Sequence, residues 1–284
     1  MTTTLIRRTK PYKHWEFLDK ETSNRLRIVP ERGGLITEWL CNGNQILYFD
    51  LDRFMIKNKS IRGGIPILFP ICGDLPLNCL TLPQGDFFMK QHGFARDSKW
   101  DIRLLENEKT FCLTLYDNSE TRRVFPYSFC LSIFVTISIN ALHFKIKIKN
   151  LSKEKMPFTF GLHPYFNVED LNKIRIEGLP FNCINQIDSK EIETREQIEN
   201  IPQGVDFLSE PSGSSSLIDL ISGRSITLVN KEPMNLNVVW SDPPRRMVCL
   251  EPWTSPRRSL ITGERQLEIN SFDSKQLEST LICS

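Results

Sequence analysis

The sequence has little of what marks several large classes of protein. No stretch approaches the roughly 18 consecutive apolar residues of a membrane-spanning helix, and residues 129–139, which come closest, alternate Ser and Thr with apolar side chains as a strand does. Residues 1–17 lack the apolar core of a secretory signal. Basic residues outnumber acidic ones by only 36 to 34, too few for a nucleic-acid surface. We therefore expect a cytoplasmic protein with no nucleic-acid and no membrane partner.

Clustered cysteines and glycine-rich phosphate loops are also missing. The eight cysteines form no CxxC pair and have no zinc-finger spacing. Several lie inside apolar runs, such as Cys112 and Cys249, which predicts reduced, buried thiols. Neither GxGxxG nor GxxxxGK[ST] occurs. The sequence thus gives no sign of a disulfide framework, a structural metal or a nucleotide-binding loop.

What is present is alternation with a period of two. Residues 142–149 place Leu and Ile or Phe on one face and His or Lys on the other, and residues 131–139 have an apolar side chain at every odd position. Asn140-Ala141 between these runs predicts a hairpin. Further strands are predicted over 111–116, 225–230, 236–240, 247–251 and 279–283.

Helical patterns are scarce by comparison. Residues 189–200 are charged without a wide apolar face, which favours a loop, an edge strand or one short turn. Seventeen prolines and fourteen glycines interrupt the 284 residues at short intervals, as in antiparallel β proteins. Because all-β units of about 250 residues can form one domain, we expect residues 1–284 to form a single all-β domain.

Four short segments differ from ordinary strands and turns, namely residues 61–73, 90–100, 158–168 and 247–256. In the first, Arg62 precedes a pair of glycines that lets the backbone approach a neighbour closely. In the second, His92 precedes Gly93, and Arg96 follows four residues after the histidine. Taken alone, the first segment is more often a turn, and a histidine such as His92 is more often structural than catalytic.

The third segment places His163 at the end of a strand, because Pro164 follows it. Flanking aromatic residues would form a partly apolar pocket that tunes the pKa of this histidine. The alternative is an edge histidine hydrogen-bonded to a carbonyl group. The two remaining histidines, His14 and His143, lie in basic surroundings and are predicted to be exposed to solvent.

The fourth segment aligns Glu251 with the apolar side chains on one face of a strand. A carboxylate in such a place is either paired or functional, because its desolvation is costly. Trp253 offers a flat face on which a sugar could stack. The structural alternative is a buried ion pair of Glu251 with Arg245 or Arg246.

In this order, "RGGIPILFP", "QHGFAR", "GLHPYF", "VVWSDPP" and "LEPWTSP" resemble the aldose 1-epimerase (galactose mutarotase-like) superfamily, most of all its hexose-6-phosphate 1-epimerase branch. The resemblance covers nearly the whole chain. It implies a large antiparallel β-sandwich with an open carbohydrate cleft. It also implies a monomer acting on a small-molecule sugar or sugar phosphate, with no cofactor and no metal in the chemistry.

Interconversion of anomers needs a base for the proton of the anomeric hydroxyl and an acid for the ring oxygen. By the resemblance, Glu251 is the base, His163 is the acid, and His92 supports charge at the sugar oxygen. Arg62 and Arg96 match arginines near the substrate, and guanidinium groups suit a phosphate. The remaining substrate contacts implied by the resemblance are Gln91, Asp206 and Trp253.

Two other functions stay open at this stage. One is a sugar-binding or sensing protein that keeps the cleft without useful turnover, although such a protein would not need a Glu–His pair. The other is a glycoside hydrolase or lyase, which normally needs two well-placed carboxylates, whereas the sequence offers one.

Overall fold

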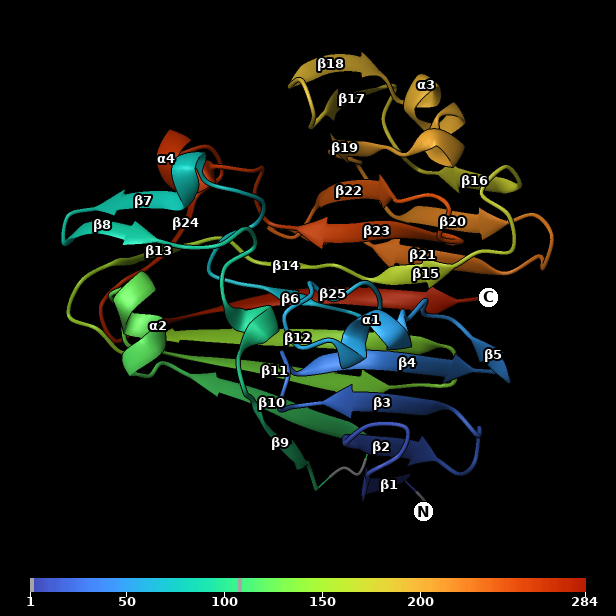
Figure 1. Cartoon of the computed structure of the whole chain (residues 1–284), viewed down its shortest axis with the longest axis horizontal. Helices are drawn as coiled ribbons and strands as arrows, with labels where there is room; N and C mark the ends of the chain where they lie inside the picture. Colours follow the sequence, from blue (N-terminus) through green and yellow to red (C-terminus); the bar gives the residue numbers. More distant parts are fainter. Residues whose placement is uncertain (1–2, 107–108) are drawn as a thin grey trace.

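The computed structural model describes residues 3–106 and 109–284, which form a two-layered, antiparallel β structure (Figure 1). One layer is an eight-stranded sheet, sheet I, with the order β16-β20-β21-β25-β12-β11-β10-β9. Its strands are β9 (Asp101–Leu104), β10 (Thr110–Tyr116), β11 (Phe129–Ile137), β12 (Ala141–Asn150), β16 (Ile174–Glu177), β20 (Ser215–Asp219), β21 (Ser225–Val229) and β25 (Ser274–Cys283).

The other layer contains a second eight-stranded sheet, sheet II, and a five-stranded sheet, sheet III. Sheet II has the order β18-β17-β19-β22-β23-β14-β6, and β15 also pairs with β23. Its strands are β6 (Ile67–Leu68), β14 (Gly161–Leu162), β15 (Tyr165–Asn167), β17 (Asn182–Asn185), β18 (Lys190–Glu193), β19 (Asp206–Ser209), β22 (Leu236–Ser241) and β23 (Met247–Trp253). Sheet III runs in chain order through β1 (Thr3–Arg8), β2 (His14–Asp19), β3 (Arg25–Val29), β4 (Leu35–Cys41) and β5 (Asn44–Gln45).

Smaller elements complete the fold. Two two-stranded ribbons pair β7 (Cys79–Leu82) with β8 (Gly85–Phe88) and β13 (Met156–Phe158) with β24 (Leu267–Ile269). The α-helices are short: α1 (Leu51–Met55), α2 (Ser119–Val124), α3 (Thr194–Glu199) and α4 (Ser259–Thr262). Residues 189–200 form edge strand β18, which was one of the three predicted alternatives, followed by the short helix α3.

The period-two alternation produces these strands. In β12 the even-numbered apolar positions are buried and the odd-numbered polar ones from His143 onward are exposed or partly exposed, as predicted. The predicted hairpin closes with the amide of Ser138 bonded to the carbonyl of Ala141. Each of the other predicted strands is present, and the last, β25, begins five residues earlier than the alternation indicated. The predicted all-β sandwich is confirmed.

The main hydrophobic core lies between the layers and takes residues from all three large sheets, for example Trp39 of β4, Ile133 of β11 and Leu250 of β23. Strand β23 is buried on both faces. Its Val248 and Leu250 belong to this core, whereas Cys249 belongs to a separate cluster on the other face. Period-two geometry therefore puts Cys249 and Glu251 on the face of sheet II that points away from the core.

Three further predictions can be compared with the structure. All eight cysteines are free thiols, and six of them are buried. Among the described residues, no helix is long and apolar enough to cross a membrane. The prediction that His14 is exposed was wrong: the residue is 2% exposed, and its Nδ1 donates to the carbonyl of Tyr12 over 2.8 Å. The ring of Tyr12, 5.2 Å away between centroids, packs against the histidine in spite of its basic neighbours in sequence.

Candidate active site

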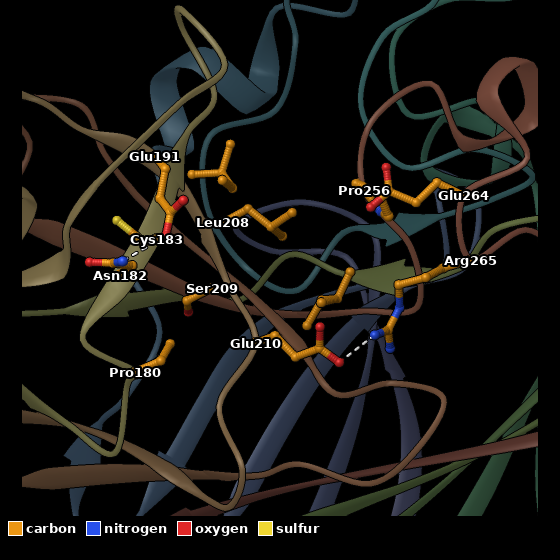
Figure 2. A pocket seen from close by; sticks show the side chains of 12 residues that line it. Pro180, Asn182, Cys183, Glu191, Leu208, Ser209, Glu210, Pro256, Glu264 and Arg265 are labelled. Atoms are coloured by element: carbon orange, nitrogen blue, oxygen red, sulfur yellow. Dashed lines mark hydrogen bonds and ion pairs between the residues drawn. The ribbon is translucent and has the colours of Figure 1, made fainter.

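Two hollows open on the outer face of sheet II. The larger, of about 290 Å³, lies over β17, β19 and β22 (Figure 2). Four of its polar side chains are paired with one another, since Arg265 bonds Glu210, and the Asn182 amide donates to Glu191 over 2.6 Å. No set of reactive side chains converges there among the residues that line it.

The smaller hollow, of about 150 Å³, contains the predicted site. All eight predicted residues line it: Arg62, Gln91, His92, Arg96, His163, Asp206, Glu251 and Trp253. They come from five segments that are far apart in the sequence. The structure adds Tyr165, Val238, Trp240 and Arg257 to the lining.

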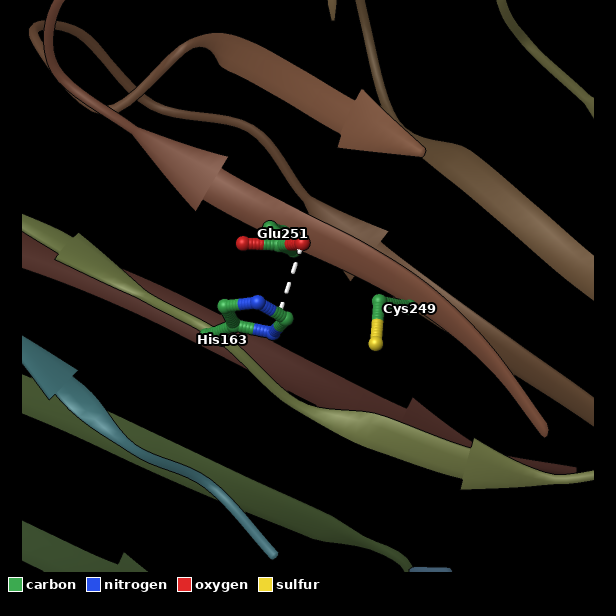
Figure 3. A group of neighbouring side chains, drawn as sticks. All are labelled: His163, Cys249 and Glu251. Carbon is green, nitrogen blue, oxygen red and sulfur yellow. Dashed lines mark ion pairs between the residues drawn. The ribbon is translucent and has the colours of Figure 1, made fainter. Parts of the chain in front are cut away.

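Glu251 and His163 face each other across neighbouring strands. Gly161 lies opposite Trp253 and Tyr165 lies opposite Cys249 in the antiparallel register, which puts His163 opposite Glu251. The His163 Nδ1 atom is 3.3 Å from Oε1 of Glu251 (Figure 3). The sequence alternative of a buried Glu251 pair with Arg245 was wrong, because Arg245 binds Asp242 and Asp50 instead.

Trp253 holds the other oxygen of this carboxylate. Its indole N–H donates to Oε2 of Glu251 over 3.0 Å, and the side chain is only 1% exposed. The prediction that Trp253 offers an open face for stacking was wrong, because its ring is enclosed beside His92, at 5.6 Å between centroids. Trp253 fixes the orientation of the carboxylate. The partly exposed Trp240 is the aromatic side chain that reaches the cleft.

Burial sets the protonation of the Glu–His pair. Desolvation, reinforced by the nearby charge of Asp206, raises the pKa of Glu251 well above its usual value. Desolvation and the positive charge of Arg96 lower the pKa of His163 well below its usual value. Both shifts favour the uncharged state, with one proton on the carboxyl group and a neutral imidazole. The His163 ring also stacks on Tyr165, 4.6 Å away and tilted by 7°.

His92 is held in one tautomer by the backbone. The amide N–H of Gly73 donates to its Nδ1 over 3.0 Å, so Nδ1 carries no proton and Nε2 carries it. The His92 amide returns a bond to the Gly73 carbonyl over 2.7 Å. Burial, followed by the charge of Arg96, lowers the pKa of His92 well below its usual value. His92 is therefore a neutral N–H donor, held with a positive φ of 65°.

Three guanidinium groups line the pocket with different degrees of neutralisation. Arg257 bonds Asp206 and lies 3.7 Å from Asp74. Arg62 lies 3.4 Å from Asp242 and packs over the Trp240 ring at 5.3 Å.

Arg96 is the least neutralised of the three. Its Nη2 donates to the carbonyl of Gln91 over 2.9 Å, while its carboxylate contact, with the exposed Asp97, is 4.0 Å long. Burial lowers its pKa, which is the mark of a desolvated cation. Arg96 is thus the arginine best able to accept an anionic ligand.

Asp206 enters the pocket from β19 as part of a small network. It accepts from Arg257 and from the amide of Gln186, the latter over 2.7 Å. Burial raises its pKa, although Arg257 opposes the change. The sequence did not single out Arg257, because its contact with Asp206 joins residues 51 positions apart. The residue directly follows the "LEPWTSP" segment, which was the available signal.

The fold is an antiparallel β-sandwich, its outer face carries a buried carboxyl–imidazole pair, and comparison with known proteins identifies the family. Residues 19–269 match the aldose 1-epimerase family, and the chain belongs to it. It is 26% identical over 259 residues to the Escherichia coli protein named "Putative glucose-6-phosphate 1-epimerase", covering 82% of this chain and 81% of that one. Protein LacX of Lactococcus lactis is 26% identical, covering 71% of this chain and 77% of LacX.

Solved structures give the same picture of the fold. The Slr1438 protein of Synechocystis sp. PCC 6803 has a TM-score of 0.91 at 30% identity, covering 100% of this chain and 99% of that one. Galactose 1-epimerase of Lactobacillus acidophilus has a TM-score of 0.75 at 13% identity, with 100% and 99% coverage. At that identity the second comparison shows the fold alone.

Proposed function

We propose that this chain is an aldose 1-epimerase that interconverts the α and β anomers of a hexose, with hexose 6-phosphate as the favoured substrate class. The observation that carries the proposal is the buried Glu251–His163 pair, with 3.3 Å between the nearest oxygen and nitrogen. Membership of the aldose 1-epimerase family supports the reaction class.

In this proposal Glu251 removes the proton of the anomeric hydroxyl while His163 delivers a proton to the ring oxygen. The C1–O5 bond breaks, and the open-chain aldehyde rotates about C1–C2. Reclosure with the two roles reversed gives the other anomer, and each group regains its starting proton. His92 donates its Nε2 proton as a hydrogen bond to a sugar oxygen, since its Nδ1 is occupied by Gly73.

The reactive ionisation state is charged glutamate with protonated histidine, whereas burial favours the uncharged pair. The acid and base are therefore present together in a minor fraction of the molecules. A bound sugar can raise that fraction by donating its anomeric hydroxyl to Glu251 and accepting from His163. Such shared protonation belongs to the pair rather than to either residue.

The preference for a phosphorylated hexose rests on Arg96 and Arg62. A partly buried guanidinium whose carboxylate contact is as long as 4.0 Å is stabilised by an incoming phosphate. The name of the Escherichia coli relative points to the same substrate class.

NMR saturation transfer between anomers tests the proposal, with glucose, galactose and glucose 6-phosphate as substrates. We expect acceleration over the spontaneous reaction, and Glu251→Gln and His163→Ala should each lower the rate at least ~100-fold. Glu210→Gln, in the neighbouring hollow, is the matched control and should keep the wild-type rate. Near-full activity in a folded Glu251→Gln or His163→Ala variant would refute these roles.

The second candidate is a sugar-binding protein without turnover. Bound sugar without acceleration for any of the three substrates would favour it.

For the glycoside hydrolase alternative, the structure supplies a second carboxylate, because Asp206 lines the same pocket as Glu251. The ion pair of Asp206 with Arg257 and its bond to Gln186 favour a role as hydrogen-bond acceptor instead.

A further inference from the structure

Cys249 is an unassigned reactive group next to the Glu–His pair. One ligand atom each from His163, Cys249 and Glu251 lies within 4.8 Å of the other two, and all three residues are buried (Figure 3). Cys249 and Glu251 are two positions apart on β23 and share a face, while His163 approaches from the opposite strand. We propose that these three side chains form an inhibitory site for a divalent cation that accepts a thiolate ligand, such as Zn²⁺.

The donor atoms are available. Among the described residues, the buried His163 Nδ1 has no hydrogen-bond partner, because its 3.3 Å approach to Glu251 is too poorly aligned to form one. The Cys249 thiol has a weak 4.0 Å contact with the Met247 sulfur. On Glu251, Trp253 uses Oε2 and leaves Oε1 on the side of the histidine.

The donor set selects the kind of cation. Imidazole nitrogen, thiolate sulfur and carboxylate oxygen are the ligands of Zn²⁺, at about 2.0–2.3 Å, and three of them leave a fourth position for water. Magnesium and calcium are excluded because they take oxygen ligands. Bond lengths of about 2.0–2.3 Å place tetrahedral ligand atoms about 3.3–3.8 Å apart, so the cluster needs only a modest contraction from its 4.8 Å limit.

Charge is balanced in the occupied site. Binding forms Zn–N, Zn–S and Zn–O bonds, and the protons of the thiol and of any protonated carboxyl group pass to solvent. One thiolate and one carboxylate then cancel the two charges of the cation. This cancellation matters because Arg62, Arg96 and Arg257 surround the pocket and would repel an uncompensated cation.

Occupation blocks catalysis because the metal engages His163 and Glu251, the two side chains that move protons in the proposed reaction. Zn²⁺ should therefore compete with the sugar. The inhibition rests on the proposed epimerase function, whereas metal binding itself does not, so the two can fail independently.

The binding test is titration of the full chain with Co²⁺, which reports a thiolate ligand through its charge-transfer absorption in the near ultraviolet. We expect this band in the wild type and its loss in Cys249→Ala. The control is Cys112→Ala, which removes a buried thiol from β10 in sheet I and should leave the band unchanged. A band that persists in Cys249→Ala, or no band in the wild type, would overturn the site.

The inhibition test is anomer exchange with increasing ZnCl₂. Cys249→Ala should need at least about tenfold more Zn²⁺ for half inhibition, since even outer-shell changes cost about 10–100-fold in metal affinity. Equal sensitivity of the two proteins contradicts the inhibition. If Cys249→Ala does not fold, X-ray absorption spectroscopy of the Zn-loaded wild type tests the site instead. One sulfur ligand together with nitrogen and oxygen ligands is expected, and two or more sulfur ligands would refute the site.

Discussion

Removing the indole N–H of Trp253 gives the sharpest test of how Glu251 and His163 share one proton. The Trp253→Phe variant keeps an aromatic ring but loses the 3.0 Å bond to Oε2 of Glu251. Because this bond stabilises the charged carboxylate, its loss raises the pKa of Glu251 further. A hydrogen bond to a charged group contributes about 1.5–3 kcal/mol, and one pKa unit corresponds to about 1.36 kcal/mol. The expected rise is therefore about 1–2 units.

The sign of the effect on rate follows from the order of the two pKa values. Burial raises the pKa of Glu251 and lowers that of His163, so the one-proton pair is mostly uncharged and the reactive form is the minor one. Each further unit in the pKa of Glu251 reduces that minor fraction about tenfold. The pH-independent maximum of kcat/KM should fall about 10–100-fold, and the alkaline limb, which reports Glu251, should move to higher pH.

The assay is the pH dependence of kcat/KM by saturation transfer, with the spontaneous rate subtracted at each pH. Trp39→Phe is the control, because it makes the same truncation in a fully buried residue of β4 whose indole nitrogen has no hydrogen-bond partner within the described chain. A Trp253→Phe profile that shifts only on its acid side, with an unchanged maximum, would show that Glu251 ionises before His163 and would refute the reasoning.

Two other predictions concern binding and stability. Arg96→Ala should raise the KM for glucose 6-phosphate about 10–100-fold, which corresponds to the loss of a charged hydrogen bond. The KM for glucose should change much less, and equal changes in the two KM values would refute the assignment of Arg96 to phosphate binding. Gly93→Ala should destabilise the protein by about 1–3 kcal/mol in chemical denaturation, because a Cβ there would lie 2.2 Å from the carbonyl oxygen of Phe69. Gly223→Ala, with a similar φ of 73° but nothing within 4 Å, is the matched control, and equal losses would argue against the steric cause.

The sequence predicted the strands and the members of the pocket better than it predicted their contacts. Alternation in residues 142–149 is a local property, and so is the strand-ending Pro164, which explains why β12 and the position of His163 were predicted. The pairing of Glu251 with His163 was predicted only through the family resemblance, because no local pattern reports the register between β15 and β23.

The errors have related physical causes. Trp253 was expected to stack on a sugar, but whether an aromatic side chain is enclosed depends on what packs above it, here His92. His14 was expected in solvent because its neighbours in sequence are basic, yet it is buried against Tyr12, a contact that strand alternation does not predict. The pairing of Arg257 with Asp206 joins residues 51 positions apart and leaves no local pattern.

In the proposed mechanism, the charge of Arg96 couples phosphate recognition to proton transfer. After desolvation, its charge is the main cause that lowers the pKa of His163. A bound phosphate neutralises that charge, raises the pKa of His163 and so enlarges the reactive fraction with protonated histidine. The phosphorylated hexose should then gain in kcat as well as in KM. Arg96→Ala should raise kcat for free glucose, since the variant removes the same charge without any phosphate. A fall in that kcat would show that the two roles of Arg96 are not coupled through its charge.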